Sequence, residues 1–156
     1  MEIKHEYEGF VKKYKLPSYE ELDNEFELLY FTNIIEISYV LRFVRRRIND
    51  RLSAFTSILQ GFLQPNPGSP INLEESSFLD ENEKKKIVIL IRELMNIERM
   101  NTLLDLDFDE KKEAEFIKNA VNKWFGLKKE IFEILKKVKK GWESKVSEES
   151  KEPYFG

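Results

Sequence analysis

Residues 117–138 read IKNAVNKWFGLKKEIFEILKKV, and this stretch decides the fold class of the chain. Its apolar residues are separated alternately by three and four positions, which places them on one stripe of an α-helix. The stripe keeps its phase through Gly126, so we predict one helix from about 110 to 145 that does not end at the glycine. The stripe consists of Ile117, Ala120, Trp124, Leu127, Ile131, Ile134 and Val138.

Glycine and proline, the residues that most often interrupt helices, are absent from two long blocks of the chain. One block lies between Pro17 and Gly61, and the other lies between Pro70 and Gly126. The sequence therefore predicts an all-α fold, a bundle of about four to five helices of which two are long. The expected helices are a short N-terminal helix within 1–16, followed by helices at 18–31, 34–63, 81–104 and 110–145.

Residues that are typical of helix N-termini predict where several of the helices begin. Residues 18–21 form a capping box, in which a serine hydroxyl and a glutamate three residues later each bind the other's main-chain amide. Asn72 and Asp80 are both followed by a glutamate three residues later, so each is a candidate N-cap, with a single helical turn at 73–78 between them. The three prolines within 64–70 predict a linker.

The chain has 156 residues, which suits one domain. We expect a single helical domain over 1–146, made of a front half, 1–63, a linker, 64–70, and a back half, 71–146. The tail at 147–156 is polar and is expected to be disordered. The predicted helices at 34–63 and 110–145 are longer than the others. Their ends are therefore expected to extend beyond the bundle and to offer a surface for homodimer formation.

The composition excludes several classes of chemistry. The net charge is −3, there is no cysteine and His5 is the single histidine, so disulfides, thiolate catalysis and multi-histidine metal sites are ruled out. The longest apolar run, Ile87–Ile91, is far too short to span a membrane, and the N-terminus lacks a signal-peptide core. We therefore expect a cytoplasmic protein. Interspersed Glu and Lys are typical of solvated helix faces and of proteins that work at high temperature.

Five arginines fall within the stretch from residue 42 to residue 51, on the predicted helix at 34–63. Guanidinium groups bind phosphate in a bidentate manner and aromatic rings stack on bases, so this surface could bind an anionic or macromolecular partner. Alternatively, the helix is buried on two sides and its arginines are paired with glutamates. The candidate binding surface consists of Tyr39, Arg42, Phe43, Arg45, Arg46 and Asn49.

Two acidic stretches are candidates for metal binding. The run of alternating aspartates at 105–109 is similar to a calcium loop, but Glu110 stands where that loop requires glycine and Phe116 where it requires glutamate. Helix capping is the simpler interpretation. Glu21 and Glu25 lie one helical turn apart, as do the carboxylates that hold Mg²⁺ in helical nucleotide phosphohydrolases. Favourable charge at a helix N-terminus is the simpler explanation of the same residues. We expect no bound metal and no cofactor.

Residues Tyr39–Leu52, an aromatic residue followed by Leu-Arg, a run of three arginines and Arg-Leu, resemble the arginine-rich helix of GINS-type replication-fork scaffold proteins. The entry to the predicted helix at 81–104 is similar as well. The resemblance implies a helical scaffold. The small β-domain typical of that family has no counterpart in the sequence.

The sequence favours a non-enzymatic helical scaffold or adaptor that binds a macromolecular partner through the arginine–aromatic helix face. Its partner is expected to be a protein or a second copy of the chain, and not a membrane. An alternative is a nucleic-acid-binding protein that uses the cluster from Arg42 to Arg51. A second alternative is a Mg²⁺-dependent helical nucleotide phosphohydrolase that uses the carboxylates at 20–27.

Overall fold

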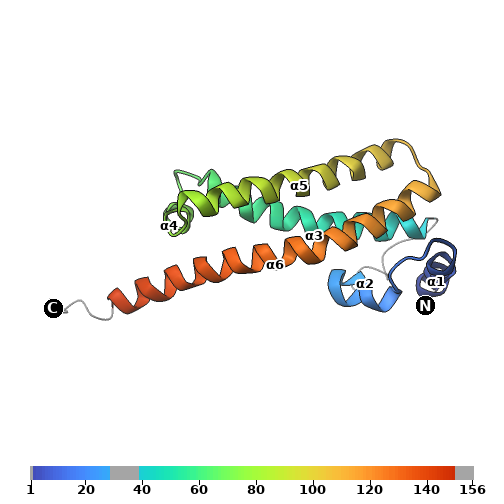
Figure 1. The fold of residues 1–156 in the computed structure, drawn as a ribbon, viewed down its shortest axis with the longest axis horizontal. Coiled ribbons are helices and arrows are strands. Elements are labelled where there is room, and N and C mark those ends of the chain that lie inside the picture. The colour runs from blue at the N-terminus through green and yellow to red at the C-terminus, as the bar shows by residue number, and fades with distance from the viewer. Residues whose placement is uncertain (1, 29–38, 150–156) are drawn as a thin grey trace. The chain divides into compact units, whose positions relative to one another are not determined.

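A computed structural model describes residues 2–28 and 39–149 (Figure 1). Within these two ranges the chain forms six α-helices and no strand, which confirms the predicted all-α fold, with one helix more than expected. The helices are α1 (Glu2–Tyr14), α2 (Tyr19–Phe26), α3 (Val40–Leu63), α4 (Pro70–Ser77), α5 (Glu81–Leu106) and α6 (Glu110–Glu149).

The chain divides into two compact units. Unit 1 comprises Met1–Thr56 and Glu93–Phe125, and unit 2 comprises Ser57–Arg92 and Gly126–Gly156. Helices α3, α5 and α6 each contribute residues to both units, so the division does not follow the expected front and back halves. The single domain over 1–146 stays a prediction.

In unit 1, the start of α2 has the predicted capping box. The Ser18 hydroxyl accepts a hydrogen bond from the amide of Glu21, and the Glu21 carboxylate accepts one from the amide of Ser18 at 2.8 Å. The helix ends at Phe26, earlier than the predicted 18–31, because Glu27 adopts the left-handed conformation with φ 54° and closes the last turn. The remainder of that prediction, and residues 34–38 of the next predicted helix, lie outside the described residues.

The core of unit 1 is centred on Trp124 of α6, which is 2 % exposed. Its ring centroid lies 5.4 Å from that of Phe55 on α3 and 6.4 Å from that of Phe26 on α2. Its indole N–H donates to Glu25 Oε1 at 2.6 Å, which satisfies the polar edge of the ring. One aromatic side chain therefore ties three helices together. On α3, the apolar residues Leu41, Val44, Ile48 and Leu52 of unit 1 are buried.

In unit 2, α4 is a full helix where the sequence predicted a single turn and a linker that includes Pro70. Ser69 is the N-cap and accepts a hydrogen bond from the amide of Asn72, so the prediction of Asn72 as N-cap is wrong by three residues. Pro70 occupies the first helical position, where its missing N–H and fixed φ are favourable. Asp80 caps α5 as predicted, through a reciprocal pair of bonds with Glu83.

Helix α6 runs through Gly126 as predicted and ends at Glu149 rather than near 145. In unit 2 its Gly141 packs directly against Phe78, since a Cβ atom built on this glycine would overlap the Phe78 ring. The same ring lies 5.1 Å from the Trp142 ring in an edge-to-face arrangement. The Trp142 N–H donates to Glu75 Oε2 at 3.0 Å. The missing side chain at 141 thus allows α6 to approach the segment that follows α4.

Candidate interaction surface

The centre of the predicted arginine surface, Arg45, is buried inside unit 1 with no exposed area. Its guanidinium joins α3 to two other helices. It donates to Glu113 Oε2 on α6, to the side-chain and main-chain oxygens of Asn101 on α5, and to Asp105 Oδ1 at 2.7 Å. Because every one of these acceptors belongs to the same unit, Arg45 acts as an internal cross-link.

The neighbouring arginines converge on the C-terminal end of α5. Arg46 Nε donates to Asp105 Oδ1 at 3.0 Å, and Arg42 Nη2 donates to the Asp105 main-chain oxygen at 3.1 Å. Helix α5 has no basic residue in its own last turn. The arginines of α3 therefore supply the positive charge that stabilises the carbonyl end of a helix.

The two carboxylates of this network have opposite pKa shifts. Burial alone would raise the pKa of Asp105, but the hydrogen bonds from Arg45 and Arg46 outweigh it and hold that pKa below its ordinary value. Burial raises the pKa of Glu113, although the bond from Arg45 opposes the shift. Glu113 has no exposed area, and its second oxygen, Oε1, accepts no hydrogen bond within the described part of the chain.

The other predicted surface residues divide between inside and outside. Phe43 is 8 % exposed and belongs to the core, and the buried Oδ1 atom of Asn49 accepts no hydrogen bond in the described ranges. Arg42 is half-buried, whereas the side chain of Arg46 is 52 % exposed. Tyr39, just before α3, is 55 % exposed. The structure thus leaves Tyr39 and Arg46 as the accessible members of the predicted set.

Tyr39 does not stand alone on this surface. Its ring centroid lies 5.0 Å from that of Phe108, in the loop between α5 and α6, and Phe108 is itself 43 % exposed. Two residues earlier, Leu106 is 83 % exposed, the largest exposed fraction among the large apolar residues that the structure describes. We call Tyr39, Arg46, Leu106 and Phe108 the aromatic face.

Leu106 and Phe108 are absent from the predicted surface, because the aspartates around them indicate helix capping. That part of the interpretation is correct at Asp109, which caps α6 through the amide of Lys112 at 3.0 Å. The sequence signal that indicates these two residues is the alternation of Leu106 and Phe108 with the aspartates at 105, 107 and 109. Leu106 is the last residue of α5 and Phe108 lies in the loop that follows, and both are exposed, so they are candidates for contact with a partner.

The carboxylates considered for metal binding have structural roles. Asp105 binds arginines, Glu21 completes the capping box and Glu25 accepts the Trp124 N–H. In the ranges that the structure describes, no three acidic or histidine side chains are arranged to hold a metal ion. The prediction of no bound metal concerns the whole chain and stays a prediction.

None of the described helices is long and apolar enough to cross a membrane. Comparison of the chain with protein-family models, with curated protein sequences and with solved structures finds no match.

Proposed function

We propose that the chain is a non-enzymatic helical scaffold or adaptor that binds a protein partner through the aromatic face. The observation that carries this proposal is the exposed aromatic pair, Tyr39 and Phe108, together with Leu106, which is two residues before Phe108 in the chain and 83 % exposed. Aromatic residues and arginine are the types most enriched at the energetic centres of protein interfaces. Arg46 lies about two helical turns after Tyr39 in the chain and binds Asp105, which directly precedes Leu106.

The charge balance of the face favours a protein over a nucleic acid. Arg42, Arg45 and Arg46 all contact Asp105, and Arg45 also binds Glu113. A phosphate group would have to compete with these internal carboxylates for the guanidiniums. Since nucleic-acid affinity depends on phosphate neutralisation by free cations, the network weakens the alternative that uses the Arg42–Arg51 cluster.

A second copy of the chain is the first partner to test. Sedimentation velocity over a range of concentrations measures self-association of the full chain. Serine at Tyr39, Leu106 and Phe108 together is expected to abolish it, whereas serine at Ile71 and Leu73 is the matched control. Those two residues are 62 % and 46 % exposed in unit 2, so the control also removes exposed apolar area.

A different protein is tested with the photoreactive residue p-benzoylphenylalanine in place of Tyr39, irradiated in cells of the source organism. We expect one discrete cross-linked protein from position 39 and not from the control position, Ile71. A chain that stays monomeric and gives no specific cross-link contradicts the proposal.

A fluorescent oligothymidine tests the nucleic-acid alternative. Binding that falls linearly with the logarithm of the salt concentration, and that is lost when Arg42 and Arg46 are both alanine, would establish this alternative instead.

A further inference from the structure

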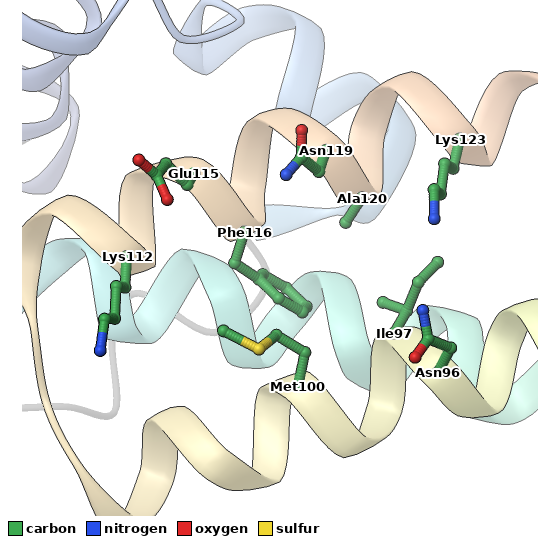
Figure 2. A pocket seen from close by; sticks show the side chains of 9 residues that line it. All are labelled: Asn96, Ile97, Met100, Lys112, Glu115, Phe116, Asn119, Ala120 and Lys123. Atoms are coloured by element: carbon green, nitrogen blue, oxygen red, sulfur yellow. The ribbon is translucent and has the colours of Figure 1, made fainter.

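A groove lies between α5 and α6 of unit 1 (Figure 2), and none of the residues that line it belongs to the aromatic face. Its floor is formed by Ile97 of α5 with Phe116 and Ala120 of α6, which are all at most 6 % exposed. Met100 is 38 % exposed, and in Figure 2 its thioether faces the Phe116 ring across the groove. Methionine adapts its shape readily, and it is frequent on surfaces that accept partner side chains.

The size of the groove indicates what kind of group it accepts. The cavity volume is about 200 Å³, below the range of roughly 300–1,000 Å³ that is typical of small-molecule sites. A dry cavity of roughly 150 Å³ holds a benzene ring. The groove is therefore large enough for one leucine- or phenylalanine-sized side chain, which is what an anchoring residue of a docked helix presents.

The rim of the groove is basic at its two ends. Lys112 and Lys123 of α6 are both exposed and lie at opposite ends of the groove in Figure 2. Glu115, the one acidic residue of the lining, is drawn on the side of α6 that points away from α5, and the α5 rim adds only the neutral Asn96. Acidic groups over the two ends of the groove would therefore meet opposite charge.

The same two lysines argue against a second copy of the chain as the occupant. A two-fold pairing of two such grooves, centred near Phe116, would bring Lys112 of one copy toward Lys123 of the other. Like charges placed together at an interface are unfavourable. A partner with acidic residues at both ends of an apolar stripe has no such penalty.

We infer that this groove binds an acidic amphipathic helix of another protein. One apolar side chain of that helix enters the hollow between Met100 and Phe116, and its acidic residues face Lys112 and Lys123. At about 1.5 Å per residue the two lysines are about 16 Å apart along α6, so the matching acidic residues are about 11 positions apart. The inference goes beyond the proposed function, because it adds a second and separate binding site.

The test uses the full chain and two fluorescein-labelled peptides of about 16 residues, a length of between four and five helical turns. The acidic probe carries a leucine stripe with glutamates on its other positions, and the control probe carries lysines in their place. Fluorescence anisotropy is expected to give micromolar binding of the acidic probe and none of the lysine probe. Equal binding of both probes, or no binding of the acidic probe, overturns the inference.

Two variants and one spectroscopic signal locate the site. Reversal of charge at Lys112 and Lys123 to glutamate is expected to weaken binding of the acidic probe about tenfold or more. The same reversal at Lys129 and Lys140, exposed lysines of unit 2, is the matched control and should leave affinity unchanged. The methyl resonance of Met100 should shift when the acidic probe binds. Unchanged affinity in the groove variant, or an unmoved Met100 signal, contradicts the groove as the site.

The two proposals fail separately. The triple serine variant of the aromatic face, at Tyr39, Leu106 and Phe108, removes no residue that lines the groove. It is therefore expected to bind the acidic probe as the wild-type chain does. Loss of probe binding in that variant contradicts a separate site, whereas unaltered binding leaves the groove standing whatever happens to the aromatic face.

Discussion

Arg45→Met is the most severe single change available in the arginine network, because it leaves buried acceptors without their donor. Glu113 has no exposed area and would lose the hydrogen-bonded partner that stabilises its charged form. Breaking a buried ion pair from one side costs about 3–5 kcal/mol. Asn101, which is 7 % exposed, would lose two bonds, and a buried unsatisfied polar group costs about 1–3 kcal/mol.

These losses share one side chain and do not add fully, so we expect Arg45→Met to lower the free energy of unfolding by about 3–5 kcal/mol. Natural domains have about 5–15 kcal/mol in total, which makes this a large fraction. Urea denaturation followed by far-ultraviolet circular dichroism, near neutral pH, measures it. A variant with no cooperative transition is also consistent with the expected loss, and a milder Arg45→Lys variant then gives the measurable value.

The double variant Arg45→Met with Glu113→Leu separates the buried charge from simple loss of packing. Removing both charges replaces the ion pair by apolar side chains, which is often close to neutral. We expect the double variant to be more stable than Arg45→Met alone, with a coupling energy of about 2 kcal/mol or more. A loss below about 1 kcal/mol for Arg45→Met, or strictly additive effects in the double variant, would refute the role of Arg45 as an internal cross-link.

Three further predictions concern stability. Gly141→Ala forces a methyl group into the Phe78 ring and should lower the free energy of unfolding by about 1–3 kcal/mol. At Gly126 an added methyl group meets nothing within 4 Å, so Gly126→Ala should raise the free energy of unfolding by up to about 1 kcal/mol. Thermal melts compare the two variants, and equal effects contradict the packing at 141. Ser18→Ala removes a cap and should cost about 1 kcal/mol in the same assay, so an unchanged melting temperature argues against the capping box. Burial raises the folded-state pKa of Glu113 above its unfolded value, so the free energy of unfolding should fall as pH rises from about 4.3 through the folded pKa. Glu113→Gln should remove this fall in urea titrations at several pH values, while the lowered pKa of Asp105 acts at lower pH, below about 3.9, where stability is lost as pH falls. A slope that Glu113→Gln leaves unchanged contradicts the assignment to that residue.

The periodic part of the fold could be predicted from the sequence because each helix carries its own apolar stripe. The seven stripe positions from Ile117 to Val138 are all buried, and α6 passes Gly126 without a break. The helix ends were less predictable. Glu27 ends α2 in a left-handed conformation, and it is neither glycine nor asparagine, the residues that usually adopt that conformation. The N-cap of α4 is Ser69 rather than Asn72. Both depend on a few hydrogen bonds that the hydrophobic pattern does not encode.

The arginine face was harder to interpret because a helical wheel describes one helix at a time. It places Arg42 and Arg46 away from the apolar stripe, but it does not show that Asp105, sixty residues away from Arg45, lies against them. The alternative in which the arginines are paired with glutamates is met at Arg45, which binds Glu113, whereas Arg42 and Arg46 are paired with an aspartate, Asp105. Pairing explains these positions without a ligand.

Pairing also changes which residues are worth testing. Arg45, whose guanidinium binds both Asp105 and Glu113, contributes to stability. Its substitution is therefore expected to affect binding only through the fold. The side chains of Tyr39 and Phe108 form a ring contact with each other, and both remain exposed, by 55 % and 43 %. Their removal should therefore leave the melting temperature almost unchanged while it abolishes association. If the Tyr39 and Phe108 variants instead lose stability and binding to the same extent, the two rings have a structural role. That result would contradict the aromatic face as a binding site.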